Sequence, residues 1–169
     1  DLSGTSNAYD YAVVGGYYID EYLHGPEVTG PYNSSNPHAV TTSATIGDIS
    51  LTFADTTVNG IILGGSHILR SQEVADVSGV RQGNITVDLK SGTFNKNIYA
   101  AGCQYSGVEL HTESTTVKIS DEVKFGKNVT VCGGYMGSGA SAVHGDTTLE
   151  FTSASKYDNI AETNFIFFD

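Results

Sequence analysis

The sequence predicts an all-β protein folded as a parallel β-helix, a solenoid of about four to five coils with inserted loops. Three observations favour this fold class. One strand-like phrase recurs along the chain, a second phrase recurs between its copies, and no segment has the apolar periodicity of a long helix. Repeated phrases in fixed order, roughly 31 residues apart, are typical of architectures in which each repeat buries its apolar side against the next one.

The first phrase runs from an Asn or Asp through a short apolar stretch to a position, five residues later, that is usually Gly. Its copies begin at Asp10, Asn59, Asn97, Asn128 and, in a degenerate form, Asn159. The steps between them are 49, 38, 31 and 31 residues. Stacked amides can hydrogen-bond along a column while they complete tight turns. We therefore expect the four asparagines to form a structural ladder, with a row of ligand contacts as the alternative. The glycines that follow are expected to permit close backbone approach at a corner.

The second phrase alternates apolar and polar residues with the two-residue period of a half-buried strand. It occupies residues 47–53, 83–89, 113–119 and 145–151, so its steps are 36, 30 and 32 residues. When the copies are stacked in register, one outward position becomes a column of hydroxyl side chains. The members of this column are Ser50, Thr86, Thr116 and Thr148. β-branched threonine suits the solvated face of a strand.

The length of 169 residues suits one domain with a sizeable core. We expect residues 1–169 to be a single β-helix domain or a fragment of a longer one, because the sequence begins at Asp1 without a Met or a signal peptide. Coil strands are expected over residues 10–19, 47–65, 83–103, 113–136 and 145–168, and inserted loops over 20–46 and 66–82. A Greek-key sandwich is the alternative, but it does not favour two phrases in constant order.

The composition excludes some functional classes. A net charge of -11 with only 8 Lys and Arg disfavours binding to nucleic acid, and no apolar run is long enough to span a bilayer. Abundant Gly and Tyr with one Met and no Trp indicate an extracellular protein. Cys103 and Cys132 are the only cysteines, and their places in the repeat separate them by roughly 8 Å, which predicts two free, partly buried thiols.

These phrases resemble right-handed parallel β-helix surface proteins of bacteria, such as autotransporter passenger domains and adhesin-like proteins. The resemblance covers roughly residues 10–168 and rests on the Gly-Asp/Asn-x-Thr-hydrophobic phrase and the hydrophobic-Gly-Gly phrase. It implies a right-handed coil and a secreted or surface-exposed chain. Pectate-lyase-like enzymes share the fold, but no match to their catalytic residues is present.

We expect a non-enzymatic cell-surface module that acts as adhesin, stalk or ligand-presenting scaffold. A polysaccharide lyase or hydrolase is the first alternative, and an ice- or mineral-binding face is the second. Loops on a rigid scaffold carry binding groups. The binding candidates in the two expected loops are Tyr22, His24, Tyr32, His38, His67 and Arg70. No catalytic, metal or cofactor motif is present. The five histidines have no short-range partner in the sequence and are expected to be surface loop residues, with metal ligands or bases as the alternative.

The expected partners are a glycan or a host protein surface, without nucleic acid and without membrane insertion by this segment. The ends of a short solenoid expose strand edges that invite pairing. Large apolar residues occupy Phe165–Phe168 near the C-terminus, and an aromatic group lies near the N-terminus at Tyr9, Tyr11, Tyr17 and Tyr18. We therefore expect end-to-end self-association of the chain.

Overall fold

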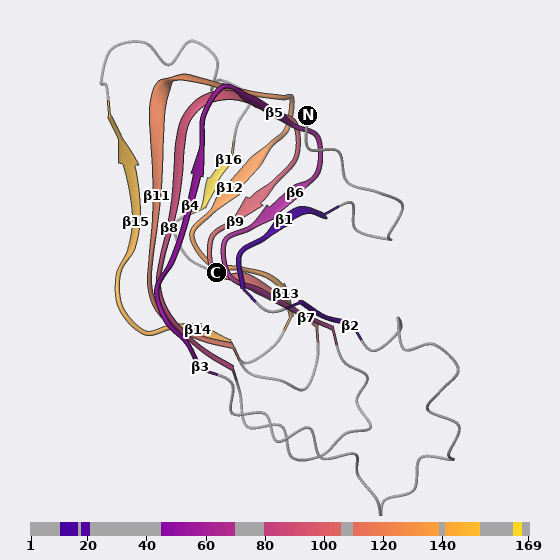
Figure 1. Ribbon diagram of the computed structural model, residues 1–169, viewed down its shortest axis with the longest axis vertical. Helices are drawn as coiled ribbons and strands as arrows, with labels where there is room; N and C mark the ends of the chain where they lie inside the picture. Colours follow the sequence, from indigo (N-terminus) through magenta and orange to yellow (C-terminus); the bar gives the residue numbers. More distant parts are fainter. Residues whose placement is uncertain are drawn as a thin grey trace, which may run out of the picture.

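The computed structural model describes residues 11–16, 18–20, 45–69, 80–105, 110–138, 141–152 and 164–166. Every secondary-structure element in these ranges is a β-strand, and the strands pair in parallel. They form three sheets, which the chain visits repeatedly in the same order (Figure 1). The prediction of an all-β chain with parallel pairing is therefore confirmed for the described ranges. Those ranges hold no helix with the length and hydropathy of a bilayer crossing.

The seven-stranded sheet is built on two long neighbours, β8 (Val80–Phe94) and β11 (Leu110–Phe125). Shorter strands pair with the outer edges of this pair. They are β3 (Thr45–Ile46), β4 (Ile49–Phe53) and β5 (Thr56–Val58) on β8, and β14 (Ala142–Val143) and β15 (Thr147–Phe151) on β11. Partners such as Ile49 with Ile85 and Thr115 with Thr147 confirm the register predicted for the second phrase.

The other two sheets are made of short strands that follow each pass through the seven-stranded sheet. The five-stranded sheet contains, in spatial order, β1 (Tyr11–Val14), β6 (Ile61–Leu63), β9 (Ile98–Tyr99), β12 (Thr130–Cys132) and β16 (Asn164–Ile166). The four-stranded sheet contains β2 (Tyr18–Asp20), β7 (Ser66–Leu69), β10 (Gly102–Tyr105) and β13 (Tyr135–Ser138). Parallel neighbours need a long connection, and here the other two sheets supply it.

Apolar side chains fill the space between the sheets in three clusters. The largest lies between the five-stranded sheet and the middle of the seven-stranded sheet, and includes Ile62, Val87 and Ile119. A second cluster joins Ile68 on the four-stranded sheet to the first residues of β8 and β11. The third contains Leu63, which follows Ile62 and therefore points to the opposite face of its strand.

Phenylalanines from successive passes touch one another inside the largest cluster. The ring of Phe94, which is fully buried, lies 5.7 Å from that of Phe53 and 6.2 Å from that of Phe125. Phe165 continues this series because its ring is 6.2 Å from Phe125 and 5.4 Å from Phe151. The aromatic contacts thus run across five strands, and Phe165 adds the last strand of the described chain to the core. Such pairs add about 0.5–1.5 kcal/mol beyond the burial of their area.

The asparagine ladder predicted from the first phrase is wrong for the described residues. Ile98 pairs with Ile62 and with Val131, so the copy that begins at Asn97 is shifted by two residues relative to the copies on either side. Asn97 therefore lies opposite Thr130, whose backbone N–H donates to its Oδ1 over 2.9 Å. Asn128 is instead exposed, with a φ of 57°.

Asn59, another member of the predicted ladder, accepts a hydrogen bond of 2.7 Å from the Nδ2 of Asn95. Asn159 lies outside the described residues. The expected role of the glycines is confirmed where the structure describes it. A Cβ on Gly64 would collide with the backbone oxygen of Ala100, and Gly102 has a φ of +117°. Successive passes of the backbone come too close at these corners for a side chain.

Two further expectations need correction. Residues 66–82 were expected to form an inserted loop, but the stretch begins with β7 and ends with the first three residues of β8. Tyr11, expected at an exposed end, is only 9 % exposed. The two cysteines are free as predicted, because Cys103 and Cys132 lie in different sheets, and both are buried rather than partly buried.

We predict that Asn128→Gly leaves the free energy of unfolding within about 0.5 kcal/mol of the wild-type value, whereas Asn128→Ala lowers it by about 1 kcal/mol. The reason is that the left-handed backbone at this exposed position strains Ala and suits Gly. Guanidinium denaturation of both variants measures the difference. Asn97→Ala is the matched control, and it should cost about 1–2 kcal/mol because the N–H of Thr130 loses its acceptor. Equal losses for Asn128→Gly and Asn128→Ala would contradict this account.

Candidate functional site

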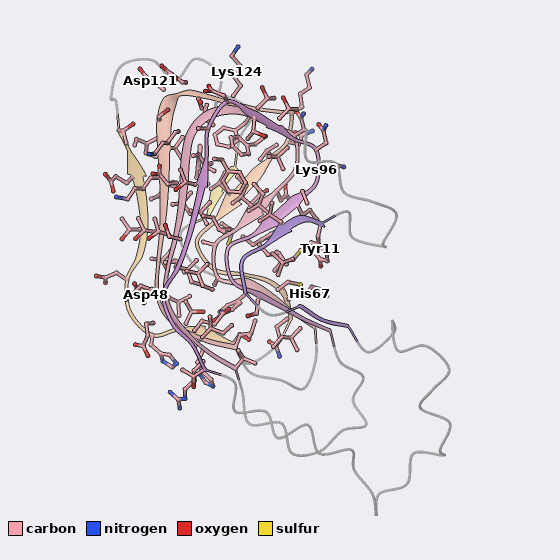
Figure 2. All side chains as sticks on the ribbon, in the orientation of Figure 1. Tyr11, Asp48, His67, Lys96, Asp121 and Lys124 are labelled. Atoms are coloured by element: carbon pink, nitrogen blue, oxygen red, sulfur yellow. The ribbon has the colours of Figure 1, made fainter. Side chains whose placement is uncertain are left out.

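The outward face of β4, β8, β11 and β15 carries polar side chains in straight columns. Ser50 pairs with Thr86, Thr86 with Thr116, and Thr116 with Thr148, as the sequence predicted. The two outer members are exposed and the two inner ones are half-buried by their neighbours. Because paired strands lie about 4.8 Å apart, the hydroxyl groups repeat at that spacing across the sheet. We call this surface the polar face (Figure 2).

A column of hydrogen-bonded amide, carboxylate and hydroxyl groups flanks the hydroxyls on one side. The Oδ1 of Asp48 accepts hydrogen bonds from the backbone N–H of Asn84 over 2.8 Å and from its Nδ2 over 3.1 Å. The Oγ of Ser114 in turn donates to the Oδ1 of Asn84 over 2.6 Å. Figure 2 shows Asp48 on the outer side of this sheet. These contacts hold the side chains upright in a row, at right angles to the strands.

A charged column flanks the hydroxyls on the other side. Thr52, Asp88, Lys118 and Glu150 are in register across the four strands. The Nζ of Lys118 lies 3.5 Å from a carboxylate oxygen of Glu150, and both side chains are exposed. Pairs of this kind contribute about 0–1 kcal/mol to stability, so they fix the pattern of charge on the polar face more than they stabilise the fold.

A histidine pair lies near the polar face, where β11 meets β14. The Nδ1 of His111 is 2.9 Å from the Nε2 of His144, and the two rings are nearly parallel with centroids 5.1 Å apart. This finding corrects the expectation that the histidines lie in loops, because His111 is in β11 and its ring meets a histidine 33 positions away. The two residues are 33 positions apart, close to the repeat period, and that spacing is the signal in the sequence that could have revealed the pair.

A buried polar network crosses the interior between the four-stranded sheet and the first residues of β8 and β11. The Oε1 of Gln82 accepts from the backbone N–H and the hydroxyl of Ser66, both over 2.7 Å. Its Nε2 donates to the oxygen of Ala101 over 3.0 Å and to the Oγ1 of Thr112 over 2.9 Å. The hydroxyl of Thr112 is 2.6 Å from that of Tyr135.

The network ends on backbone oxygens, since the hydroxyl of Tyr135 donates to Leu110 over 3.0 Å and to Ala142 over 3.2 Å. Burial raises the pKa of Tyr135 to about 12, and its hydrogen bonds to Thr112 and Gln82 oppose this rise. A phenol in this environment stays protonated and donates. We interpret the network as structural, because Gln82 and Thr112 are both buried and hydrogen-bonded.

His67, the one binding candidate in the described residues, is fully buried in β7 and does not lie in a surface loop. It packs against Tyr11, with ring centroids 4.7 Å apart, and it is the register partner of Cys103 (Figure 2). The hydroxyl of Tyr11 is 3.5 Å from the Sγ of Cys103. Burial raises the pKa of the Cys103 thiol to about 11, against the weaker effect of that hydrogen bond. The thiol is therefore a poor nucleophile at neutral pH.

The other binding candidates, Tyr22, His24, Tyr32, His38 and Arg70, lie outside the described residues. Within the described ranges, no three His, Cys, Asp or Glu side chains are grouped so that they could hold a metal ion. Comparisons with protein-family models, with curated proteins and with solved structures found no match for this chain. The features of the described residues that bear on function are the polar face, the histidine pair and the buried interior.

We predict that the protein loses stability as the pH rises above about 10, the usual tyrosine value. The pKa of Tyr135 rises from 10.0 to about 12 on folding, so its protonated form stabilises the fold below pH 10 and this contribution is lost as the pH approaches 12. Urea denaturation at a series of alkaline pH values measures the effect. Tyr135→Phe should be less stable at neutral pH, because hydrogen bonds are lost, but its stability should depend less on pH above 10.

Cys103→Ala tests a second pH range in the same experiment. The pKa of the Cys103 thiol rises from 9.0 to about 11, so this variant should remove the loss of stability between those values and leave the later loss intact. If wild type and both variants lose stability in parallel, the two buried groups do not control the alkaline transition.

Proposed function

We propose that the chain is a right-handed parallel β-helix of about four to five coils that works outside the cell as a non-enzymatic adhesin, stalk or ligand-presenting scaffold. The constant order in which the chain visits its three parallel sheets supports the solenoid. The proposal also rests on the resemblance of the two phrases to bacterial β-helix surface proteins. Its ligand would be a molecule that itself repeats, such as an extended glycan, or a protein surface.

The polar face is the observation that carries this proposal. Its hydroxyl column and its charged column each extend over four strands in constant register, and the hydrogen-bonded row of Asp48, Asn84 and Ser114 lies beside the hydroxyls. The columns repeat about every 4.8 Å across the sheet, and successive outward residues lie about 6.6 Å apart along each strand. A ligand with a periodic set of hydroxyl or carboxylate groups can therefore meet several equivalent partners at once, which strengthens weak individual contacts.

The chemistry of the face suits binding better than turnover. Asp48 accepts two hydrogen bonds from Asn84, and Glu150 is paired with Lys118, so these carboxylates already have partners within their columns. The thiol of Cys103 and the phenol of Tyr135 have raised pKa values and are buried in the interior. General acid–base catalysis needs a group with a suitable pKa within reach of the substrate, and neither group meets both conditions.

We predict that Thr86→Arg with Thr116→Arg weakens binding to a polysaccharide or host-surface ligand by at least about tenfold, because two long side chains interrupt the central column. Glycan arrays identify the ligand with the wild-type protein, and surface plasmon resonance measures both variants. The matched control is Thr57→Arg with Thr93→Arg, an outward register pair on β5 and β8 beyond the polar face.

A further variant tests whether the ligand binds the polar face or the first expected loop. In this variant a short linker replaces residues 21–44. Loss of binding in this deletion alone would move the ligand site to the loop. Release of reducing or unsaturated ends from the bound polysaccharide would contradict the non-enzymatic role.

The hydroxyl column also favours a second candidate, an ice- or mineral-binding face. Its four members form an evenly spaced row on one face of the sheet, as a crystalline surface requires. The flanking charges of Asp88 and Lys118 distinguish the two candidates, because hydrated charges oppose contact with ice and suit a mineral or an acidic glycan. Thermal hysteresis and adsorption to mineral powders, measured with the same arginine variants, test this alternative.

We also propose that the chain associates end to end. Among the described strands, β15 and β16 each pair on one side only, with β11 and β12, and an open edge is a template for pairing. Phe151 beside this edge is 38 % exposed and contacts Phe165. We predict concentration-dependent association in sedimentation velocity, which Phe151→Lys should reduce severalfold by placing a charge at the apolar contact.

The control for this experiment is Thr57→Lys, which adds the same charge at an exposed position on β5. A monomer at all concentrations, or equal effects of the two lysines, would argue against association through this end.

A further inference from the structure

We propose that His111 and His144 form a two-imidazole binding site for a late first-row divalent metal ion, with Cu²⁺ preferred. The site is independent of the ligand function of the polar face. Three observations support it: the separation of the two ring nitrogens, the backbone that fixes the two residues, and the local arrangement of charge. Neutral imidazole is a good ligand for copper, nickel and zinc.

The two residues are held in place by parallel pairing between β11 and β14. His111 is the register partner of Ala142, and the backbone N–H of His144 donates to the oxygen of Thr112 over 2.8 Å. The next residue, Gly145, donates to the oxygen of Glu113 over 2.6 Å. Because these bonds fix the backbone at both residues, only the side chains have to adjust when a metal binds, and little ordering entropy is lost.

The separation of the ring nitrogens lets one ion reach both rings. The Nδ1 of His111 and the Nε2 of His144 are 2.9 Å apart in the hydrogen-bonded pair. With metal–nitrogen bonds of about 2.0–2.1 Å, two neighbouring ligand positions are roughly 2.9–3.3 Å apart, so small rotations of the side chains bring both nitrogens to one metal. The general affinity order for divalent metals places Cu²⁺ first.

Metal binding replaces the hydrogen bond between the rings. One nitrogen of the neutral pair carries the shared proton, and that proton must move through solvent to the other nitrogen of the same ring. Both facing lone pairs are then available, and the rings turn so that these lone pairs converge on the metal. No net proton is released from a neutral pair, while a singly protonated pair releases one.

The surrounding charges set the affinity. Arg81 is the register partner of His111 on β8 and is exposed, so its positive charge opposes a cation at the site. Glu113 is exposed two residues along β11, on the same side of the strand as His111, and it favours a cation. The net charge of -11 adds a long-range attraction. Within the described ranges, no group of three His, Cys, Asp or Glu side chains surrounds a common point, so the two imidazoles are the ligands that this proposal assigns.

The experiment uses the full chain without a polyhistidine tag. Isothermal titration calorimetry measures the affinities for Cu²⁺, Ni²⁺ and Zn²⁺, and electron paramagnetic resonance of the Cu²⁺ complex counts the coordinated nitrogens. We expect one Cu²⁺ per chain with two imidazole nitrogens, and a higher affinity for Cu²⁺ than for Ni²⁺ or Zn²⁺. His111→Gln and His144→Gln should each weaken Cu²⁺ binding by about 100-fold, because one ligand alone loses the chelate advantage. The double variant should bind Cu²⁺ more weakly than either single variant, because the last imidazole ligand is lost.

Two control proteins make the result specific. His24→Gln with His38→Gln removes two other histidines and should leave the affinity unchanged. Arg81→Gln should strengthen Cu²⁺ binding by roughly threefold, because a positive charge about one strand spacing away is removed. Circular dichroism shows whether each variant is folded, and the nitrogen count in the wild-type protein tests the proposal even if a histidine variant fails to fold. Unchanged affinity in His111→Gln, or a spectrum with a single coordinated imidazole, would overturn the proposal.

Discussion

The parallel pairing of β8 with β11 is the constraint on which the rest of the structure depends. These strands pair from Val80 with Leu110 to Phe94 with Phe125, with one register shift between Ile119 and Glu122. The remaining strands of the seven-stranded sheet pair with one of these two. Figure 1 shows the two strands following the same bent path beside each other. Because side chains alternate along both strands, this single register decides which residues enter the core and which form the polar face.

The bends in these long strands explain why one sheet can cover two separate parts of the core. In β8, Val80 and Gln82 are buried, and then Ile85, Val87 and Leu89 are buried, so the inward face changes between Gln82 and Ile85. The first group faces the four-stranded sheet and contains the polar network around Gln82, while the second faces the five-stranded sheet and is apolar. Hydrogen bonds are directional, so the network around Gln82 is satisfied in one register only. Apolar packing is less selective, and the network therefore helps to fix the register of the whole sheet.

The comparison of the two phrases shows what the sequence could predict. The second phrase has strict alternation and little variation in length, and its register was predicted correctly for β4, β8, β11 and β15. In the first phrase, Val13 and Val14 pair with Ile62 and Leu63 as predicted, whereas the copy that begins at Asn97 is misaligned by two residues and the degenerate last copy by three. A shift of two residues returns every side chain to the same face, so hydrophobic pattern alone cannot detect it. The correct register depends on corner geometry, such as the left-handed φ of Asn128 and the hydrogen bond from Thr130 to Asn97.

The parts of the candidate site differ in the same way. The hydroxyl column follows from alternation within one phrase and could be predicted, whereas the histidine pair needs the register between β11 and a two-residue strand that carries no clear pattern. His67 has polar character and a place beside Gly64 and Gly65, which made it look like a loop residue, yet both faces of β7 are covered.

The two faces of the strands differ in how well they tolerate substitution. An outward residue of the polar face contacts mainly its column neighbours, such as Asp48 with Asn84 and Ser114 with Asn84. An inward residue contacts side chains from several strands, as Phe94 does with Phe53 and Phe125. Substitution of outward residues therefore leaves the register intact, while substitution of inward residues disturbs several passes at once. A scaffold with this property can alter the ligand it presents without losing its fold, and this is the physical basis for placing function on the polar face.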